Sequence, residues 1–390
     1  MLKINPLSTL YVGIDVSSKS NYVCALDFYK NKYINSSFAN NQPGAEELAL
    51  KILECLKEHP DITTIVAALE STSVYSIHIA NYLSSCEELM RFKPYVFVLN
   101  PKCTANYKKS YIGLGKSDPI DAFVIADYAR AGNIESEPWR GSQFLALKRL
   151  TRHRLHLVEC MTREKTYLVS NLYLKFSELQ MLEGDDQPFC DIYGATSSSV
   201  LMEYFSPEEI LDSSEEDLIA FLAKKSRNRI KDISKTADLL KKAARDSYRL
   251  DKALYEPLNV SIASSFNCIE TFKREIKVID NAIEKEIKGL NPNAFIILQS
   301  IDGIGPVFAG GIIAEIGDIT AFHSSDALAK YAGLTWKSNQ SGDFDGEDTP
   351  MIKAGNRYLR YYLGEAANSM RKHNVEYGTY YRKKYNEVPK

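Results

Sequence analysis

The sequence lacks the features that mark most secreted, membrane and metal-binding proteins. Its seven cysteines are scattered, the closest two being Cys86 and Cys103, which excludes a C-x-x-C zinc pair and a dense disulfide framework. The six histidines form no HExxH motif, and neither a P-loop nor a GxGxxG occurs. No apolar run approaches the roughly 20 residues that a bilayer requires, and the first residues lead into YVGID without the apolar core of a signal peptide. We therefore expect a cytoplasmic protein with reduced thiols.

What is present is typical of a soluble globular protein with several domains. The composition is 45% hydrophobic and 25% charged, which excludes disordered and fibrous proteins. A chain of 390 residues is also too long for one ordinary hydrophobic core. We expect two or three domains.

The formal net charge of −2 conceals a strong segregation of charge along the chain. Residues 181–220 hold eleven Asp or Glu and no Lys or Arg, whereas 140–180, 221–252 and 351–390 are basic. Basic stretches interleaved with tyrosine favour contact with a nucleic-acid backbone, because each neutralised phosphate releases counterions. The alternative is that they are solvated helix faces. The candidate contacts are Lys241, Lys242, Arg245, Lys353, Arg357 and Arg360.

The first part of the chain has an α/β pattern. Three closely spaced strand-like runs come first, namely YVGIDVS, NYVCALDFY and NKYINSSFA. An amphipathic helix over 45–59, a buried strand over 63–70, a helix over 74–86 and a strand over 94–101 follow. A meander followed by alternating helix and strand is the order of ribonuclease H-like folds. A further helix is expected over 117–132.

The middle of the chain is dominated by two long helical patterns. One runs from Gln143 to about Phe176, and the second has heptad spacing from Ile262 to Leu290. These helices could pair within one chain or between chains, and a helical insert, acidic and then basic, lies between them. From Ala294 onward the pattern predicts a helix, a glycine hairpin and a helix, and then two helices flanking the loop SNQSGDFDGEDTP.

Four carboxylates of the α/β part stand out by position. Asp15 and Glu70 each end an apolar strand, and Asp118 and Asp121 lie three apart at a helix start, hence on one face. Strand-end carboxylates converge at one sheet edge, and oxygen ligands of this kind suit Mg²⁺. Singly, each has a plain alternative as a turn or capping residue. Together they are the pattern of a nuclease domain like the Holliday-junction resolvases, with metal ions that clamp a phosphodiester.

The segment SIDGIGPVFAGGI has the composition of a helix-hairpin-helix motif. Gly303 and Gly305 would let the backbone turn tightly and present its amides to a phosphate, and Pro306 starts the next helix. The alternative is a turn that only brings two helices close together. Ser341 lies in a loop rich in glycine and aspartate, and no histidine or lysine beside it could act as a base.

At this point the motifs justify a comparison with a known family. The chain resembles the transposases of insertion sequences related to the pilin-gene invertase, the bridge-RNA-guided DEDD recombinases. The resemblance rests on YVGIDVSSK, AALESTSVY and KSDPIDAFVIADYAR near the start of the chain. Near the end it rests on LQSIDGIGPVFAGGIIAEIGDITAF, LAKYAGLTW, QSG and KAGNRYLRYYL.

The resemblance implies a composite active site. Its four metal-binding acids match Asp15, Glu70, Asp118 and Asp121, and its serine nucleophile matches Ser341, which would form a covalent phosphoserine with DNA. The implied domains are a RuvC-like domain over 1–140, a helical and coiled-coil region over 141–293, and a mostly α-helical transposase domain over 294–390. In the family, Mg²⁺ stabilises the negative charge that develops as the serine attacks a DNA phosphate. We expect that Mn²⁺ would substitute for it.

The implied partners are donor and target DNA, a structured guide RNA and further copies of the chain in a homodimer or homotetramer near the nucleoid. Two alternatives stay open. One is a structure-selective nuclease that uses metal-activated water and needs no serine. The other is a catalytically silent, truncated transposase that binds nucleic acid, because the resemblance implies a further basic helix after Lys390.

Overall fold

The computed structural model describes residues 4–71, 73–134, 138–139, 141–336, 340–341, 344–345 and 350–387. The chain divides into two compact units, Met1–Ala146 with Gly317–Ala329, and Leu147–Ile316 with Lys330–Lys390. Within the part described, no helix combines the length and apolar character needed to cross a membrane. The three domains expected from the sequence, over 1–140, 141–293 and 294–390, remain a prediction.

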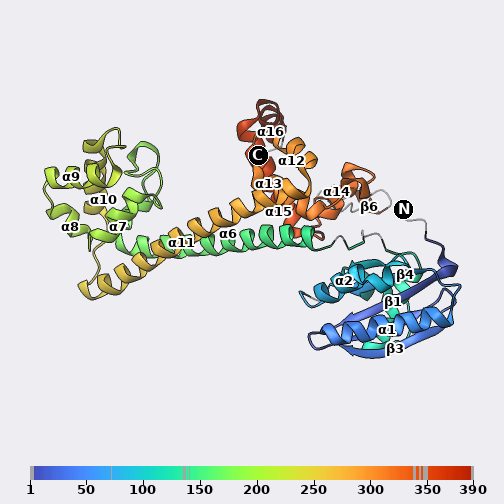
Figure 1. Cartoon of the computed structure of the whole chain (residues 1–390). Coiled ribbons are helices and arrows are strands. Elements are labelled where there is room, and N and C mark those ends of the chain that lie inside the picture. Colours follow the sequence, from blue (N-terminus) through green and yellow to red (C-terminus); the bar gives the residue numbers. More distant parts are fainter. Residues whose placement is uncertain are drawn as a thin grey trace. The chain divides into compact units, whose positions relative to one another are not determined.

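The first unit contains a mixed five-stranded sheet in the order β3-β2-β1-β4-β5 (Figure 1). Strands β1, β2 and β3 form the antiparallel meander, whereas β4 and β5 add in parallel to β1. The strands are β1 Thr9–Val16, β2 Ser20–Leu26, β3 Lys32–Ala39, β4 Thr64–Glu70 and β5 Tyr95–Leu99. The helices are α1 Gln42–Glu58, α2 Ser76–Ser85, α3 Glu87–Met90, α4 Pro101–Lys108 and α5 Asp118–Arg130. This confirms the α/β order expected from the sequence.

Two cores cover the two faces of the sheet, because successive side chains of a strand point to opposite sides. Leu10, Val12 and Ile14 of β1 belong to the core that includes Leu48 and Ile52 of α1. Tyr11 belongs instead to the core that includes Ala122, Ile125 and Ala126 of α5. Odd-numbered residues of β1 therefore face α5.

Two long helices, α6 Ser142–Lys175 and α11 Lys252–Leu290, lie side by side in the second unit (Figure 1). They are antiparallel, since Arg154 pairs with Asp280 and Lys175 bonds to Asn259. The heptad residues Ile262, Ile269, Ile276 and Ile283 are buried within the chain itself. Of the two kinds of pairing that the heptad pattern left open, the structure thus shows the one within a single chain. The second helix also begins at Lys252 rather than near Ile262.

The insert between these helices forms a small helical bundle on one end of the pair. Its core joins Leu218 and Leu240 to Leu168 and Phe266 of the long helices. Lys175 is fully buried there, and its ammonium donates to the carbonyls of Leu201 and Tyr204 at the end of α7. Burial lowers the pKa of Lys175 to about 8. The insert helices are α7 Ala195–Glu203, α8 Pro207–Asp212, α9 Glu215–Ser226 and α10 Ile233–Asp246.

In the part described, the end of the chain is mostly helical and contains a short two-stranded ribbon. Gly311 of α13 lies against the buried ring of Tyr362 of α15, since a Cβ there would come within 2.4 Å of the ring. The Tyr362 hydroxyl donates to the carbonyl of Thr151 in α6 at 2.7 Å. The helices are α12 Pro292–Gln299, α13 Pro306–Ile316, α14 Ser325–Ala332, α15 Arg357–His373 and α16 Val375–Glu387. The ribbon pairs β6 Gln340–Ser341 with β7 Phe344–Asp345.

Candidate active site

Asp15 and Glu70 stand next to each other at the carboxyl ends of two parallel strands. Ile14 of β1 pairs with Leu69 of β4, so the following residue of each strand lies at the same edge of the sheet. Leu69 belongs to the core under α1, which places Glu70 on the opposite face, the one that Tyr11 and Asp15 share. Both carboxylates therefore lie on the face covered by α5.

Helix α5 approaches this face closely because β1 has a glycine at the crossing point. A Cβ on Gly13 would fall 2.2 Å from the carbonyl oxygen of Ala122 and 2.3 Å from the nitrogen of Ala126. Asp118 and Asp121 lie in the first turn of α5, just before this contact. The close approach thus brings the D-x-x-D pair to the strand ends.

The electrostatics of Asp15 show that all four carboxylates form one cluster. Burial raises the pKa of Asp15 to about 6, with further raising by the charges of Asp121, Glu70 and Asp118 and opposition from Lys108. The three acids that act on Asp15 are the other three that the sequence singled out. A carboxyl group surrounded by like charges is a common sign of a cation site.

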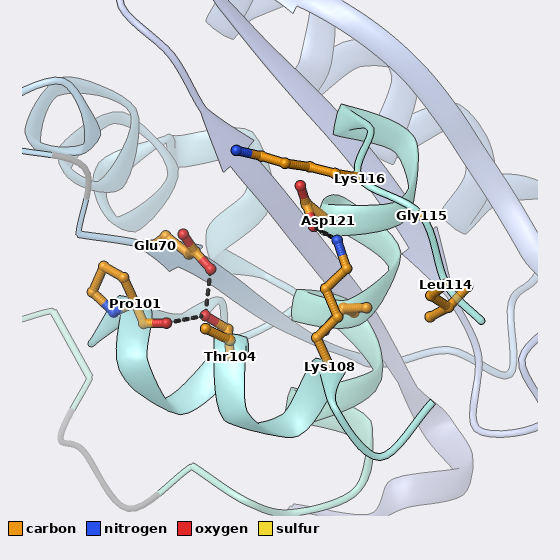
Figure 2. A pocket seen from close by; sticks show the side chains of 10 residues that line it. Glu70, Pro101, Thr104, Lys108, Leu114, Gly115, Lys116 and Asp121 are labelled. Atoms are coloured by element: carbon orange, nitrogen blue, oxygen red, sulfur yellow. Dashed lines mark hydrogen bonds and ion pairs between the residues drawn. The ribbon is translucent and has the colours of Figure 1, made fainter. Parts of the chain in front are cut away.

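Helix α4 supplies two side chains that sequence reasoning missed. Lys108 forms an ion pair with Asp121, and the Thr104 hydroxyl donates to Glu70. Figure 2 shows these two pairs in a pocket of about 480 Å³, into which Lys116 also extends. Only the lysine-rich composition of this helix pointed to its role, and that composition does not say which lysine faces the acids.

The buried Asp127 fastens α4 to α5 and so fixes the wall of this pocket. Its carboxylate accepts from Tyr107 at 2.8 Å, from Tyr111, from Arg130 at 2.6 Å and from Lys30 at 3.3 Å. Burial alone would raise the pKa of Asp127, but these hydrogen bonds lower it below its ordinary value. Asp127 is thus an ionised anchor.

The donor set suits a hard divalent cation, because it consists of carboxylate oxygens. In the portion that the structure describes, no three His, Cys, Asp or Glu side chains are arranged to hold a metal ion. Asp121 is paired with Lys108 and Glu70 with Thr104 instead. The chemistry of the acids therefore fits a metal, whereas their present side-chain positions serve internal partners.

Ser341 lies in a strand of the short ribbon rather than in an irregular loop. Its backbone pairs with Phe344 in antiparallel register. Ser338 and Gly342, which belong to the loop SNQSGDFDGEDTP predicted around Ser341, lie outside the described residues. A hydrogen bond joins the chain before the ribbon to the chain after it: the Ile352 amide donates to the carbonyl of Thr335 at 2.8 Å.

The base of this serine segment, residues 333–355, is closed by two glycines and an arginine. A Cβ on Gly355 would fall 2.4 Å from the nitrogen of Gly333, so the two backbones touch only because both residues are glycine. The Arg360 Nη1 donates to the carbonyl of Ala332 at 2.8 Å and to that of Lys353 at 3.1 Å. Arg360, predicted to contact nucleic acid, thus spans both ends of the segment.

The remaining candidate residues lie in different parts of the second unit. On α10, Lys242 and Arg245 are exposed, whereas Lys241 is partly buried and donates to the carbonyl of Ser213 at 2.8 Å. Lys353 and Arg357 are both exposed, and the Arg357 Nη2 forms an ion pair with Oε1 of Glu159 at 3.5 Å. Their contact with nucleic acid stays a prediction.

The glycine hairpin lies between two helices, as the sequence predicts, with α12 before it and α13 after it. Gly303 has a φ of 97°, and a Cβ there would fall 2.8 Å from the nitrogen of Met370. Gly303 therefore brings the turn against α15. Among the described residues, no atom other than those of its chain neighbours lies within 4 Å of the Cβ position of Gly305. Phosphate binding by this hairpin stays a prediction.

Two family models match the chain. Residues 12–177 match a model described as transposase and named for the DEDD transposases of IS110. Residues 296–382 match the transposase family IS116/IS110/IS902. The first match contains all four clustered acids, and the second contains the serine segment.

Relatives with curated descriptions extend the similarity between these two matches. The uncharacterized 42 kDa protein of insertion element IS900 from Mycobacterium paratuberculosis is 25% identical over 357 residues, 91% of this chain and 83% of that protein. The uncharacterized 44.8 kDa protein of IS116 from Streptomyces clavuligerus is 24% identical over 390 residues, which cover 97% of this chain and 88% of that protein. The pilin gene-inverting protein of Moraxella lacunata is 27% identical over 160 residues, 41% of this chain and 46% of that protein.

Proposed function

Because the chain belongs to the IS110/IS116 family of transposases, enzymes that cleave and rejoin DNA, we propose that it recombines DNA with a serine nucleophile, a divalent metal and a guide RNA. The observation that carries the proposal is the placement of four carboxylates at one edge of the sheet: Asp15 and Glu70 near the ends of paired strands, and Asp118 and Asp121 in the first turn of α5. Such a concentration of negative charge needs a cation before a DNA phosphate can approach.

Asp15, Glu70, Asp118 and Asp121 would hold Mg²⁺ or Mn²⁺. A bound ion of this kind supplies Lewis-acid stabilisation of the charge that develops on a phosphate oxygen. Lys108 and Thr104 would then release their acids, and the Lys108 ammonium would remain beside the site as a phosphate contact. Asp127 would keep α4 in place during this exchange.

Ser341 would carry the covalent step. Its Oγ gives up its proton and forms a bond to the phosphorus while the bond from phosphorus to a deoxyribose oxygen breaks, and that oxygen takes up one proton and leaves as a hydroxyl, so no proton is gained or lost overall. A hydroxyl from another strand end reverses the reaction and joins the new strands. Because the phosphoserine conserves the energy of the phosphodiester, no free broken end is needed.

Donor DNA, target DNA and a structured guide RNA are the proposed partners, acting on a homodimer or homotetramer. The basic residues Lys242, Arg245 and Lys353 support phosphate contact, since each is exposed. Oligomers would need a surface other than the heptad stripe, which is buried within the chain. The cytoplasmic, nucleoid-associated location remains a prediction.

The serine separates this proposal from its main rival, a nuclease that activates water. Cleavage of a suitable DNA by the proposed enzyme leaves a strand end attached to protein, seen as a band that survives denaturation and disappears with protease. Ser341→Ala should lose both the adduct and the cut, and Ser338→Ala should lose neither. Cutting at the normal rate by Ser341→Ala would establish the water-activating nuclease instead.

The carboxylates separate an active enzyme from a silent nucleic-acid-binding transposase. Glu70→Gln and Asp121→Asn should abolish cleavage in Mg²⁺ while binding to DNA and RNA stays nearly intact. The matched control is Glu54→Gln, an exposed acid of α1, the helix that covers the other face of the sheet. Full cleavage by either cluster variant contradicts the metal site, and absence of cleavage by the unaltered protein with its RNA favours the silent alternative.

A further inference from the structure

Helix α16 presents four exposed tyrosines on one face. Their exposed fractions are 49% for Tyr377, 61% for Tyr380, 43% for Tyr381 and 65% for Tyr385. At 3.6 residues per turn, these four side chains fall within an arc of about 140°. Side chains of this size are usually mostly buried, so a row of exposed rings, called the tyrosine face below, marks an interaction surface.

Helix α16 contacts the rest of the protein at Gly378, which lies beside the tyrosine face, about 20° from Tyr385 by helical angle. Gly378 is buried, and a Cβ there would fall 2.8 Å from the carbonyl oxygen of Arg371 at the end of α15. The side chain of Asn374 caps α16 by accepting from the amides of Glu376 and Tyr377. The helix is therefore anchored near its start, by the Asn374 cap and the close approach of Gly378 to α15, and the four tyrosine rings stay exposed.

The surroundings of the tyrosine face are basic. Residues 371–387 contain five Lys or Arg and two Glu. The Arg371 guanidinium lies 4.6 Å from the centre of the Tyr381 ring, and the Tyr381 and Tyr385 rings are nearly parallel, 6.1 Å apart and inclined by 23°. Flat rings and a guanidinium plane among positive charges are the two components of surfaces that bind unpaired bases and the phosphates between them.

We propose that the tyrosine face of α16 binds the unstacked bases of a single-stranded nucleic acid. This deepens the proposed function, on which it rests, by naming the surface that receives a guide-RNA loop or an opened DNA strand. Rings stack on bases of any identity, so the surface would hold a strand without reading its sequence. Duplex DNA offers no such base faces, because its bases are stacked inside the helix.

A protein partner fits this surface less well. Tyrosine is enriched in protein interfaces, but lysine is depleted from their cores. Lys384 lies inside the arc of the tyrosine face, between Tyr377 and Tyr380 by helical angle. Its exposed ion pair with Glu387 is of the kind that contributes little, so the ammonium remains free to exchange partners.

The test measures binding by the full chain to a labelled single strand of about 16 nucleotides, without metal, so that cleavage plays no part. The test variant is Tyr380→Ala/Tyr385→Ala, and Tyr380→Phe/Tyr385→Phe keeps both rings. Tyr29→Ala removes a tyrosine that is 73% exposed in the other unit and serves as the matched control. Ribose and deoxyribose strands of one sequence distinguish RNA from DNA, and an abasic strand removes the bases alone.

We expect the alanine variant to bind the normal single strand at least 10-fold more weakly, whereas the phenylalanine variant and Tyr29→Ala bind it unchanged. The abasic strand should bind all four proteins equally, and duplex DNA should show no such difference. An equal loss for duplex or abasic strands, or no loss at all, overturns the proposal. So does a fall in oligomer mass in the alanine variant, which would assign the face to a second copy. Ser341→Ala should bind like the unaltered protein, so failure of the serine mechanism leaves this test intact.

Discussion

The guanidinium of Arg152 and the carboxylate of Glu315 form a two-point ion pair whose acidic side chain is fully buried. The Arg152 Nε donates to Oε1 at 2.8 Å and Nη2 to Oε2 at 2.9 Å. The same Oε2 accepts from the Asn356 amide at 2.8 Å, and Asn356 caps α15 by accepting from the amides of Tyr358 and Leu359. One carboxylate thus joins α6, α13 and the residue that follows the serine segment.

Removing the cation should cost stability because the acid stays buried. We expect Arg152→Met to lower the free energy of unfolding by about 3–5 kcal/mol, measured by urea denaturation. The matched control is Lys51→Met, which breaks an exposed pair with Glu54 and should cost less than about 1 kcal/mol. The double variant Arg152→Met/Glu315→Gln should recover part of the loss. Equal costs for the buried and exposed pairs would contradict this account.

The position of Arg360 gives a prediction that separates two roles for it. If Arg360 closes the base of the serine segment, Arg360→Ala should slow adduct formation by Ser341 at saturating DNA and leave the affinity for DNA unchanged. If it contacts phosphate instead, the affinity and its dependence on salt should both fall. Measuring both quantities decides between the roles, and Lys242→Ala, an exposed change on α10, provides the comparison for a phosphate contact.

The α/β fold and its acidic cluster were predictable because two periodicities sufficed. Alternation along β1 and β4 places Asp15 and Glu70 on one face, and spacing by three places Asp118 and Asp121 on one helix face. Local patterns of this kind survive in a single sequence. The close approach of α5 does not follow from them, because it depends on Gly13, which neither periodicity marks as the point of contact.

The side chains around the acids and the serine were not predictable in the same way. Thr104 and Lys108 meet their acids through the packing of α4, and Glu315 meets Arg152 over 163 positions of sequence. The sequence spacing says nothing about such contacts. The long helices were expected, but the heptad pattern fits pairing within a chain as well as between chains, and the pattern alone could not choose.

The raised pKa of Asp15 predicts that the site destabilises the fold when it is charged. The native pKa is about 6, above the roughly 3.9 of an unfolded chain. At a pH between these two values the native state therefore binds more protons than the unfolded state. This proton binding stabilises the native state at low pH, and the stabilisation is lost as the pH rises through 6. Asp15→Asn should be more stable than the unaltered protein at neutral pH without metal, yet inactive.

The matching measurement is urea denaturation at acidic and neutral pH, with and without Mg²⁺. The advantage of Asp15→Asn should disappear near pH 4, and Mg²⁺ should stabilise the unaltered protein more than the variant. Glu54→Gln, an exposed acid, should show neither effect. A variant less stable than the unaltered protein at neutral pH would mean that the cluster is held together by other contacts.

The close contact at Gly13 sets how near α5 lies to β1. In Gly13→Ala the new methyl group would overlap the Ala122 carbonyl, which lies 2.2 Å from its position, so α5 must shift away from β1. We expect a loss of about 1–3 kcal/mol in the free energy of unfolding. Because the shift carries Asp118 and Asp121 away from Asp15, cleavage should fall much further than the fraction of folded protein. Gly364→Ala is the control: it lies within α15, where no atom of the described residues beyond the helix's own backbone lies within 4 Å of its Cβ position, and it should be neutral or stabilising by up to about 1 kcal/mol. A Gly13→Ala protein that folds and cleaves normally would show that the approach of α5 does not set the geometry of the acids.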